Sequence, residues 1–334
     1  MSERQNTPMN IATALNQKYI NYTIVMLTSL CENNPVHIDA YLLHSELTDE
    51  NIKYMQNCLS QYNIALIPIT VDKELFDDRF PRNSKWSLEA YYRLFLLDYL
   101  PASVERILYL DVDLIINKSL EEFYTVDFGT DEIIACADCH GLIGWEGRKE
   151  KQRQMFAPMI EMEYQYFNSG VMLLNISQMR GKYNFNFYLQ AIMEWNFEMY
   201  APDQDILNYV HWQHIGYIDP YTYNLVACQA YNEHIPYADV KENAFIIHFT
   251  GPKPWNTTDV HFDIEKIWWD YAALTPCYPI LTSDFVRDMF ENSVLGKKFQ
   301  SLYDQLNLTT QQLAQLNEVN KLYQELVGML QPST

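Results

Sequence analysis

The sequence predicts an α/β fold with a single open, mostly parallel, Rossmann-like sheet, followed by a small helical appendage at the C-terminus. Three observations support this fold class. Short apolar runs alternate with helix-like segments, one such run contains two closely spaced aspartates, and the last part of the chain changes to a helical pattern. Because 334 residues can bury a full α/β core, we expect a main domain over residues 1–280 and a helical tail over residues 281–334.

Strand-like and helix-like segments alternate through the first half of the chain. Short apolar runs predict strands at 11–15, 37–43, 64–69, 107–116 and 133–137. Helical patterns lie between them at 24–31, 48–59 and 86–99. The second of these helices begins at a Thr48 cap, and the third contains Arg93 and ends before Pro101. This order indicates a doubly wound sheet, in which ligands bind at the carboxyl ends of the strands.

The second half of the main domain holds a long irregular segment, followed by further strands and helices. Residues 140–163 show no clear periodicity, so we expect a mobile loop that closes over a ligand. The polar turn 166–170 comes directly before an apolar strand that runs to Asn175. Helices are expected over 184–200 and from Ile206, and a late strand over 244–249.

The tail carries a different pattern. Apolar side chains recur at spacings of three, four or seven residues, at Leu306, Leu313, Leu316, Tyr323, Val327 and Leu330. This spacing indicates an amphipathic helix with a cap at Thr309 and Thr310. The helix either self-associates, which would make the protein a homodimer, or packs on the chain's own domain, and the second arrangement is the commoner one.

The composition argues against several kinds of partner and site. A formal net charge of −20 argues against binding to nucleic acid or to anionic membranes, and no apolar stretch is long enough to span a bilayer. The polar N-terminus lacks the apolar core of a signal peptide, so we expect a cytoplasmic protein of a bacterium. The six cysteines are scattered. Without a second Cys or His pair, Cys136 and Cys139 fit small residues at a strand end better than a redox or zinc site.

The two aspartates in the segment 107–116 are the strongest indication of a site. Asp111 and Asp113 interrupt an apolar strand, where an unpaired buried charge is strongly unfavourable. Residues i and i+2 of an extended chain point to the same side, so both carboxylates can converge on one divalent cation at the strand end. His248 can add an imidazole, and Lys253 follows on a Gly-Pro loop. Together they predict a Mn²⁺-like site for a nucleotide diphosphate.

Four stretches of this sequence together resemble glycosyltransferase family 8, the retaining family that includes glycogenin and bacterial lipooligosaccharide α-galactosyltransferases and α-glucosyltransferases. They read YLDVD, FNSG before VMLLN, PDQDILN and HFTGPKPW, and with the first strand they follow the family's order over roughly residues 9–280. The resemblance implies a GT-A type of nucleotide-diphospho-sugar-binding sheet. It also implies a UDP-hexose donor, bound Mn²⁺ or Mg²⁺, and α-linked transfer to a sugar hydroxyl of a glycan or glycoprotein.

The resemblance further implies roles for individual residues. Asp111, Asp113 and His248 would hold the metal ion against the UDP diphosphate. The other donor-binding residues would be Ala12, Thr13, Ala14, Asn16, Tyr19, Val112, Asn168, Gly251 and Lys253, with Tyr19 stacked on the uracil and Lys253 on the phosphates. The residues at the reacting sugar would be Arg93, Asp138, Asp203 and Gln204, with Gln204 on the β face of the anomeric carbon.

Two departures from the family pattern bear on the substrates, and one residue bears on the mechanism. Many relatives have an acidic residue where this chain has Asn16, whose amide can still hydrogen-bond to uracil. Membrane-acting relatives tend to have a basic, aromatic C-terminus, whereas this tail is slightly acidic, so we expect a soluble acceptor and no strong membrane association. UDP-galactose and UDP-glucose both remain open as donors. Because an amide such as Gln204 is a poor nucleophile, we expect a front-face reaction in which the departing phosphate takes the acceptor proton.

Two alternatives come from other functional classes. A catalytically silent sugar-nucleotide or glycan-binding protein would be expected to lose a metal ligand or the Asp203–Gln204 pair, and this chain retains them all. A phosphotransferase with an aspartyl nucleophile would carry its two aspartates on the first strand, with Thr or Val two residues beyond the second. Here the motif lies far along the chain, and Ile115 fills that position.

Overall fold

The computed structural model describes residues 8–76, 80, 87–139, 150–199, 201–257, 262–292 and 294–330. The chain divides into two compact units. The first contains the residues up to Pro254 together with Phe262–Tyr278, and the second contains the short segment from Trp255 and the residues from Pro279 onward. Each unit is described below by itself.

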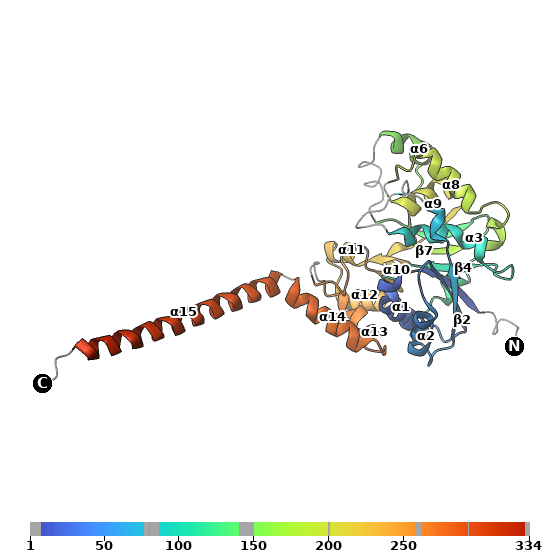
Figure 1. Cartoon of the computed structure of the whole chain (residues 1–334). Helices are drawn as coiled ribbons and strands as arrows, with labels where there is room; N and C mark the ends of the chain where they lie inside the picture. Colours follow the sequence, from blue (N-terminus) through green and yellow to red (C-terminus); the bar gives the residue numbers. More distant parts are fainter. Residues whose placement is uncertain are drawn as a thin grey trace. The chain divides into compact units, whose positions relative to one another are not determined.

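The first unit is built around a sheet of seven described strands in the order β3-β2-β1-β4-β7-β6-β8 (Figure 1). These strands are β1 Met9–Ala14, β2 Ile38–His44, β3 Ile64–Thr70, β4 Ile107–Leu110, β6 Ile133–Ala137, β7 Phe167–Leu174 and β8 Ile215–Ile218. All neighbouring pairs are parallel except those that involve β7, which runs antiparallel to both β4 and β6. The predicted fold class, an α/β protein with an open and mostly parallel sheet, is confirmed.

A second, smaller sheet of the described chain contains β5 Leu114–Ile116, β10 Ile246–His248 and β9 Leu225–Val226. β5 runs antiparallel to β10, and β10 runs parallel to β9. The segment 107–116 is therefore two strands in different sheets, joined by Asp111, Val112 and Asp113. The aspartates lie on this link and not within one continuous strand, which explains how two carboxylates are accommodated between apolar runs.

Helices connect the strands and cover the sheets. Thr48 caps one of them as predicted, since its side chain accepts a hydrogen bond from the Asn51 backbone N–H. The described α-helices of this unit are α1 Ile20–Asn33, α2 Asp49–Cys58, α3 Leu96–Tyr99, α4 Glu121–Tyr124, α6 Glu150–Glu161, α7 Ile176–Met179, α8 Phe185–Glu194, α9 Pro202–His211, α10 Pro220–Tyr223, α11 Ala227–Asn232, α12 Tyr237–Asn243 and α13 Glu265–Ala272. The described ranges of this unit also contain the 3₁₀ helices η2 Gln17–Tyr19, η3 Lys73–Leu75 and η4 Leu88–Phe95.

The helix predicted over residues 86–99 is present from Leu88 to Tyr99, although not as one regular α-helix. The chain forms the 3₁₀ helix η4 and only then one α-helical turn, α3. Five consecutive side chains, from Tyr91 to Phe95, are buried, and η4 contacts β1, β2, α8 and α9. A surface α-helix buries one face only, so a segment covered on all sides takes its geometry from its neighbours.

The loop predicted over residues 140–163 is also partly wrong. Residues 140–149 lie outside the described part of the chain, but Glu150–Glu161 forms the helix α6 with Pro158 inside it. Gln152, Phe156 and Met159 are buried at helical spacing, and Gln152 Nε2 donates to the Glu198 carbonyl at 2.6 Å. These widely spaced contacts stabilise a helix whose local sequence contains an unfavourable proline.

The helix predicted over residues 184–200 is shorter than expected, since α8 covers Phe185–Glu194. The helix predicted to begin at Ile206 begins earlier, at Pro202. α8 is capped by the Asn184 side chain and ends at Glu194, after which Asn196 and Phe197 take φ values of 52° and 57°. Such left-handed backbone conformations end a helix. α9 begins at Pro202, a residue favoured in the first helical turn, so Asp203 and Gln204 lie at its N-terminus.

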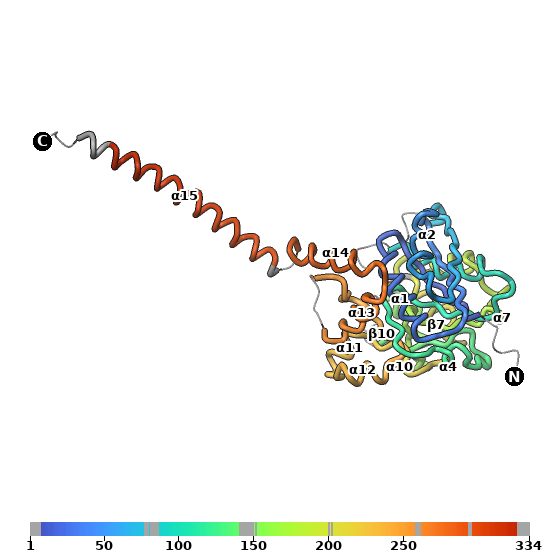
Figure 2. The backbone as a smooth tube through the Cα atoms, turned by 90° about the horizontal axis from the view of Figure 1, so that it is seen from below, coloured from blue at the N-terminus to red at the C-terminus, as the bar shows by residue number. Residues whose placement is uncertain are grey.

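The second unit contains α14 Tyr278–Glu291, apart from its first residue, and α15 Val294–Leu330, a helix of 37 residues. Figure 2 labels both helices. The sequence predicts a helical tail here, and its helices are present. None of the helices in the described ranges is both long and apolar enough to cross a membrane.

Candidate functional site

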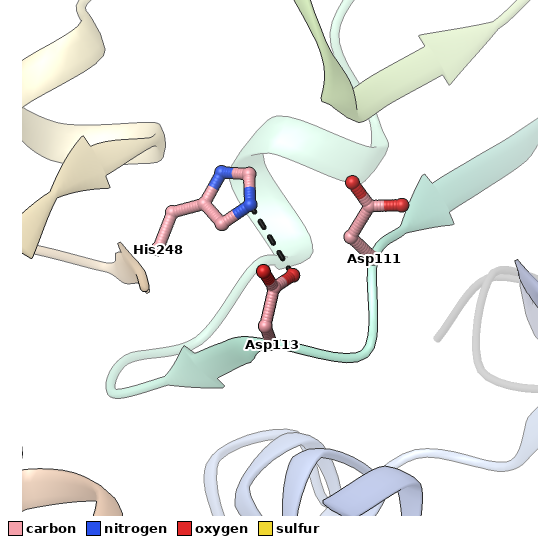
Figure 3. A group of neighbouring side chains, drawn as sticks. All are labelled: Asp111, Asp113 and His248. Carbon is pink, nitrogen blue, oxygen red and sulfur yellow. Dashed lines mark ion pairs between the residues drawn. The ribbon is translucent and has the colours of Figure 1, made fainter. Parts of the chain in front are cut away.

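Asp111, Asp113 and His248 lie together where β4 leaves the main sheet and β10 ends (Figure 3). One ligand atom of each residue lies within 4.8 Å of the other two, and His248 Nε2 is 3.3 Å from Asp113 Oδ1. Backbone hydrogen bonds position the aspartates. Asp111 N–H donates to the Gly170 carbonyl, and Phe249 N–H donates to the Asp113 carbonyl, each at 2.9 Å. The structure thus brings together the three residues that the sequence predicts as metal ligands.

The space between these side chains suits a divalent cation. Two carboxylates and one imidazole form a donor set that fits Mn²⁺ or Mg²⁺. Gly170 borders this space, because a Cβ atom there would lie 2.5 Å from His248 Cε1 and 2.7 Å from Asp111 Oδ2. Any side chain at position 170 would therefore enter the metal site. Within the described part of the chain, no other group of His, Cys, Asp and Glu side chains is close enough to hold an ion.

Asn224 sets the orientation of the His248 ring. Asn168 Oδ1 accepts a hydrogen bond from Gly170 N–H at 3.0 Å, so the same oxygen must accept from Asn224 Nδ2, 2.9 Å away. The Asn224 amide then turns its Oδ1 toward His248 Nδ1, at 2.8 Å. An amide oxygen can only accept, so Nδ1 carries a hydrogen, and Nε2 is the ring nitrogen that faces the candidate metal site.

Lys253 forms an ion pair with Asp113 beside the metal site. Its Nζ contacts Asp113 Oδ2 and donates to the Phe249 carbonyl at 2.8 Å. Burial lowers the pKa of Lys253, but the Asp113 carboxylate raises it by a larger amount, so the pKa of Lys253 lies above its ordinary value. Burial likewise raises the pKa of Asp113, but Lys253 and His248 lower it well below its ordinary range. Both groups are therefore charged at neutral pH. Gly251, two residues before Lys253, has a φ of 80°, a left-handed backbone conformation that glycine adopts without strain.

Arg93 is the central cation of the neighbouring buried network. Its Nη2 is 2.9 Å from Asp111 Oδ1, and its Nε is 3.0 Å from Asp203 Oδ2. Nη1 donates to Ser169 Oγ at 3.0 Å, and the guanidinium lies 4.4 Å from the centroid of the Tyr109 ring. Burial lowers the pKa of Arg93, but the two carboxylates raise it by more, so it stays charged. Burial also raises the pKa of Asp203, which Arg93 partly offsets.

The Gln204 side chain is held in one orientation next to this network. Its Oε1 accepts from the Ser169 backbone N–H at 3.0 Å and from Asn168 Nδ2 at 3.3 Å. Its Nε2 donates to Asp138 Oδ2 at 3.2 Å, and Asn168 Nδ2 donates to the same oxygen at 3.3 Å. Asn168 is thus hydrogen-bonded to Asn224 on the metal side and to Gln204 and Asp138 on the other side. This chain of amides joins the two halves of the site.

The remaining predicted residues surround the ends of β1 and β4. Ala12 and Thr13 are fully buried within β1, whereas Ala14 is half-buried at its end. Asn16 Oδ1 caps η2 by accepting from Lys18 N–H at 3.1 Å. Burial raises the pKa of the half-buried Tyr19, with smaller effects from Lys253 and Asp113, so Tyr19 lies within their electrostatic reach. Val112, between the two aspartates, is buried.

Four residues of the site had no role assigned from the sequence. Ser169 and Gly170 belong to the FNSG motif, so their neighbourhood was recognised but not their contacts with Arg93 and His248. Tyr109 precedes the first aspartate within an apolar strand, and its hydroxyl donates to Asp111 Oδ1 at 3.2 Å. Nothing in the sequence around Asn224 distinguishes it from an ordinary turn residue.

Comparison with known proteins agrees with this geometry. The family model described as Glycosyl transferase family 8 matches residues 10–259, which is most of the chain and includes every residue of the site. The chain belongs to glycosyltransferase family 8. This membership confirms the predicted family and its enzyme class, and it removes the aspartyl phosphotransferase as an alternative.

Individual relatives of this family 8 chain include bacterial enzymes. It is 29% identical over 202 residues to a putative glycosyltransferase of Haemophilus influenzae, a match that covers 60% of this chain and 58% of that protein. It is 24% identical over 273 residues to a lipopolysaccharide 1,2-glucosyltransferase of Escherichia coli, covering 77% of this chain and 75% of that one. The chain thus spans less than two thirds of the first of these relatives.

A solved structure of the galactosyltransferase LgtC, in complex with donor and acceptor sugar analogs, resembles this chain in fold. The TM-score is 0.65 at 24% identity, and the match covers 80% of this chain and 96% of LgtC. The likeness confirms the GT-A type of fold that the family resemblance implied.

Proposed function

We propose that this chain transfers a hexose from a UDP-hexose to a sugar hydroxyl of a glycan, with retention of the anomeric configuration and with Mn²⁺ or Mg²⁺ bound. The observation that carries the proposal is the pair of joined networks around Asn168. One contains the Asp111–Asp113–His248 cluster with its cationic neighbour Lys253, and the other contains Arg93, Asp138, Asp203 and Gln204. The first suits a diphosphate, and the second suits the hydroxyls of a sugar.

In this proposal, Asp111, Asp113 and His248 hold the cation and Lys253 binds the diphosphate. When bound, the ion would supply Lewis-acid stabilisation of the leaving group. Lys253 is paired with Asp113, so it is already charged and positioned next to the expected phosphates. It adds fixed positive charge where negative charge develops as UDP departs. Tyr19 and Asn16 are proposed to bind the uracil at the end of β1.

The second network is proposed to bind and orient the hexose. Asp203 is held by Arg93 and by Ser169 Oγ, at 3.0 Å each, which leaves lone pairs of a fixed carboxylate for sugar hydroxyls. The Gln204 amide is fixed by its bonds to Ser169 and Asp138. A neutral amide is a poor nucleophile, so Gln204 is proposed to stabilise the developing positive charge with its oxygen. The acceptor hydroxyl then attacks from the side of the leaving group, whose phosphate oxygen takes the proton.

The donor and acceptor are proposed from the named relatives. The Escherichia coli relative is named a 1,2-glucosyltransferase of lipopolysaccharide, and LgtC is named a galactosyltransferase. UDP-glucose and UDP-galactose are therefore the two donors to compare. A soluble oligosaccharide of the lipopolysaccharide type is the first glycan acceptor to test, and a glycoprotein is the second.

The first experiment measures UDP release from a panel of UDP-sugars with Mn²⁺, without acceptor, for the unmodified chain and for Asp113→Asn. We expect slow hydrolysis of one UDP-hexose that is lost on chelation and in the variant. Adding an oligosaccharide acceptor should raise UDP release many-fold and yield an α-linked product. The anomeric configuration of the product is read by NMR.

Two results would contradict the proposal in different ways. Tight UDP-sugar binding without turnover, even with acceptors, would support the silent binding protein. Absence of UDP-sugar binding in a protein that unfolds cooperatively would overturn the assignment of the site itself.

A further inference from the structure

The apolar side chains of α15 follow a heptad repeat. Successive positions are separated alternately by three and four residues, as in the a and d positions of a coiled coil. In the described side chains the series reads Phe299, Leu302, Leu306, Thr309, Leu313, Leu316, Asn320 and Tyr323. The sequence continues it to Leu295 before and to Val327 and Leu330 after. The repeat therefore extends over the whole of α15, and it includes positions occupied by Phe, Thr, Asn and Tyr as well as by leucine.

This seam is open to solvent along the described part of α15. Every described side chain from Lys297 to Glu325 is exposed. Among the seam residues, Leu306 is 63% exposed, Leu313 58% and Leu316 64%. A helix of 37 residues is about 55 Å long at 1.5 Å per residue, and helices of this kind obtain their stability from packing of an apolar face. An apolar seam of this length therefore indicates a partner of similar length.

The charges of α15 are arranged so that two copies can approach along this seam. The acidic residues of the helix, Asp304, Glu318 and Glu325, all occupy the f position, which points away from a coiled-coil partner. The flanking e and g positions between Tyr303 and Gln324 contain no charged residue. A chain with a net charge of −20 would repel a second copy through most surfaces, but this seam brings no acid close to its counterpart.

Asn320 specifies how two helices would pair. It occupies an a position within an otherwise apolar stretch of the seam. In a parallel, in-register pair the two Asn320 amides meet and hydrogen-bond to each other. In a parallel pair shifted by one or two heptads, each amide would face an apolar side chain and lose its hydrogen-bond partner. In an antiparallel pair Asn320 would lie opposite Thr309, so the cross-linking test below decides the direction of the helices. A single polar residue at an a position thus favours one register.

We propose that α15 is a dimerisation helix, which forms a parallel, in-register, two-stranded coiled coil with the α15 of a second copy of this chain. The proposal rests on the second unit alone and does not depend on the enzymatic activity. It makes the protein a homodimer joined through its C-terminal helices.

The first test measures the oligomeric state of the full chain by size-exclusion chromatography with light scattering. We expect a dimer for the unmodified chain. The double variant Leu306→Ser/Leu313→Ser, which removes two a positions, should weaken self-association at least tenfold and elute as a monomer at micromolar concentration. The matched control is Leu308→Ser/Leu322→Ser, since these residues are 57% and 60% exposed but lie at c positions outside the seam. The control should remain dimeric.

The second test determines the orientation of the helices. Leu302 occupies a d position near the start of α15, so two Leu302→Cys chains should form a disulfide-linked dimer on mild oxidation only if the helices are parallel and in register. Leu308→Cys, on the outer face, and the unmodified chain with its own six cysteines serve as controls and should not cross-link.

Three results would overturn the proposal. A monomeric unmodified chain would mean that the seam is covered within its own molecule or by another partner. A dimer that the seam and control variants lose equally would place the interface elsewhere. A dimer that resists cross-linking at position 302 would exclude the parallel register. UDP-sugar hydrolysis is measured on the seam variant as well. If the variant is monomeric and still hydrolyses the UDP-sugar, the proposed enzymatic function holds whatever the outcome for the dimer.

Discussion

Two buried ionic clusters touch opposite ends of the same helix, α9, and they differ in how completely their polar groups are paired. At the N-terminal end, Asp203 and Gln204 belong to the candidate site. At the C-terminal end, His211 belongs to a second cluster with Glu132, Lys182, Tyr183 and Tyr188, which we call the closed cluster.

The closed cluster satisfies its members without any ligand. His211 Nδ1 is 2.9 Å from Glu132 Oε2, and His211 Nε2 is 2.9 Å from the Tyr188 hydroxyl. Lys182 Nζ donates to the other Glu132 oxygen at 2.8 Å, and the Tyr183 hydroxyl donates to Oε2 at 2.9 Å. Glu132 and His211 side chains have no exposed surface. One carboxylate therefore has a donor on each oxygen, which is what a stabilising buried group requires.

The candidate site, by contrast, contains more carboxylate than its cations can pair. Arg93 and Lys253 face the three carboxylates of Asp111, Asp113 and Asp203. The Asp111 and Asp113 side chains remain 26% and 15% exposed, and the lack of a Cβ at Gly170 lets Asp111 and His248 lie close to its backbone. Excess negative charge on partly exposed side chains indicates a site for a cation and its ligand. In this chain, burial of ionic groups is common to both clusters, whereas an excess of carboxylates over cations is found in the candidate site.

The largest expected effect comes from Gly170→Ala, whose added Cβ would collide with two of the candidate metal ligands. Its Cβ would lie 2.5 Å from His248 Cε1, so we expect Mn²⁺ affinity in the presence of UDP to fall by about a hundredfold or more. Calorimetric titration measures this loss, and thermal unfolding without metal checks the fold. Unchanged Mn²⁺ affinity would show that the ion binds elsewhere.

A smaller loss is expected from Asn224→Ala, which removes the acceptor that orients His248. We expect Mn²⁺ affinity to fall by about 10- to 100-fold, the usual range for residues that orient a metal ligand. Asn224→Asp keeps an oxygen acceptor for Nδ1 but loses the Nδ2 donor to Asn168, so it should lose less affinity than Asn224→Ala without matching the unmodified chain. If the two variants bind Mn²⁺ equally well, the orientation of His248 does not depend on Asn224.

The closed cluster should respond in stability and not in substrate binding. His211→Ala leaves the Tyr188 hydroxyl and one Glu132 contact unpaired, so we expect the free energy of unfolding to fall by about 2 kcal/mol. The KM for the donor should change less than about twofold, since His211 lies at the far end of α9 from Asp203. The exposed His214 provides the control, and His214→Ala should change stability by less than about 0.5 kcal/mol. A large change in the KM for the donor with little change in stability would mean that the closed cluster acts in substrate binding and not in stabilising the fold.

The same cluster should also make stability depend on pH. Burial raises the pKa of Glu132, but hydrogen bonds from His211, Lys182 and Tyr183 lower it to about 2, from an ordinary 4.5. Burial lowers the pKa of His211 below its ordinary 6.5, against an opposing effect of Glu132. In both cases the unfolded chain binds the proton more readily, so the stabilisation is present at neutral pH and is lost on acidification. The loss begins near pH 6.5 for His211 and lies between pH 4.5 and about 2 for Glu132.

Urea unfolding between pH 7 and pH 3 measures this dependence, with a slope of up to about 1.4 kcal/mol per pH unit for each group. Glu132→Gln should show a shallower loss below pH 4.5 than the unmodified chain. Identical slopes for the two proteins would mean that Glu132 contributes nothing to acid denaturation.

The sequence by itself determined the fold class, most of the strands and the metal cluster. Short apolar runs such as those of β1, β2 and β3 are stable mainly when buried in a sheet, so the local sequence pattern is enough to predict a strand there. Asp111 and Asp113 were recognised because charge within an apolar run needs an explanation. The motifs FNSG, PDQDILN and HFTGPKPW identified the remaining functional stretches because their order matched a known family.

Only the tertiary structure decided the elements and contacts that depend on distant parts of the chain. The 3₁₀ geometry of η4 and the helix α6 follow from burial against other elements, which local propensity does not report. Asn224, the closed cluster and the close approach of Asp111 and His248 to Gly170 each depend on residues tens of positions apart. The physical reason is that hydrogen bonds and ion pairs are satisfied in space, whereas a sequence shows which groups need partners without showing where the partners lie.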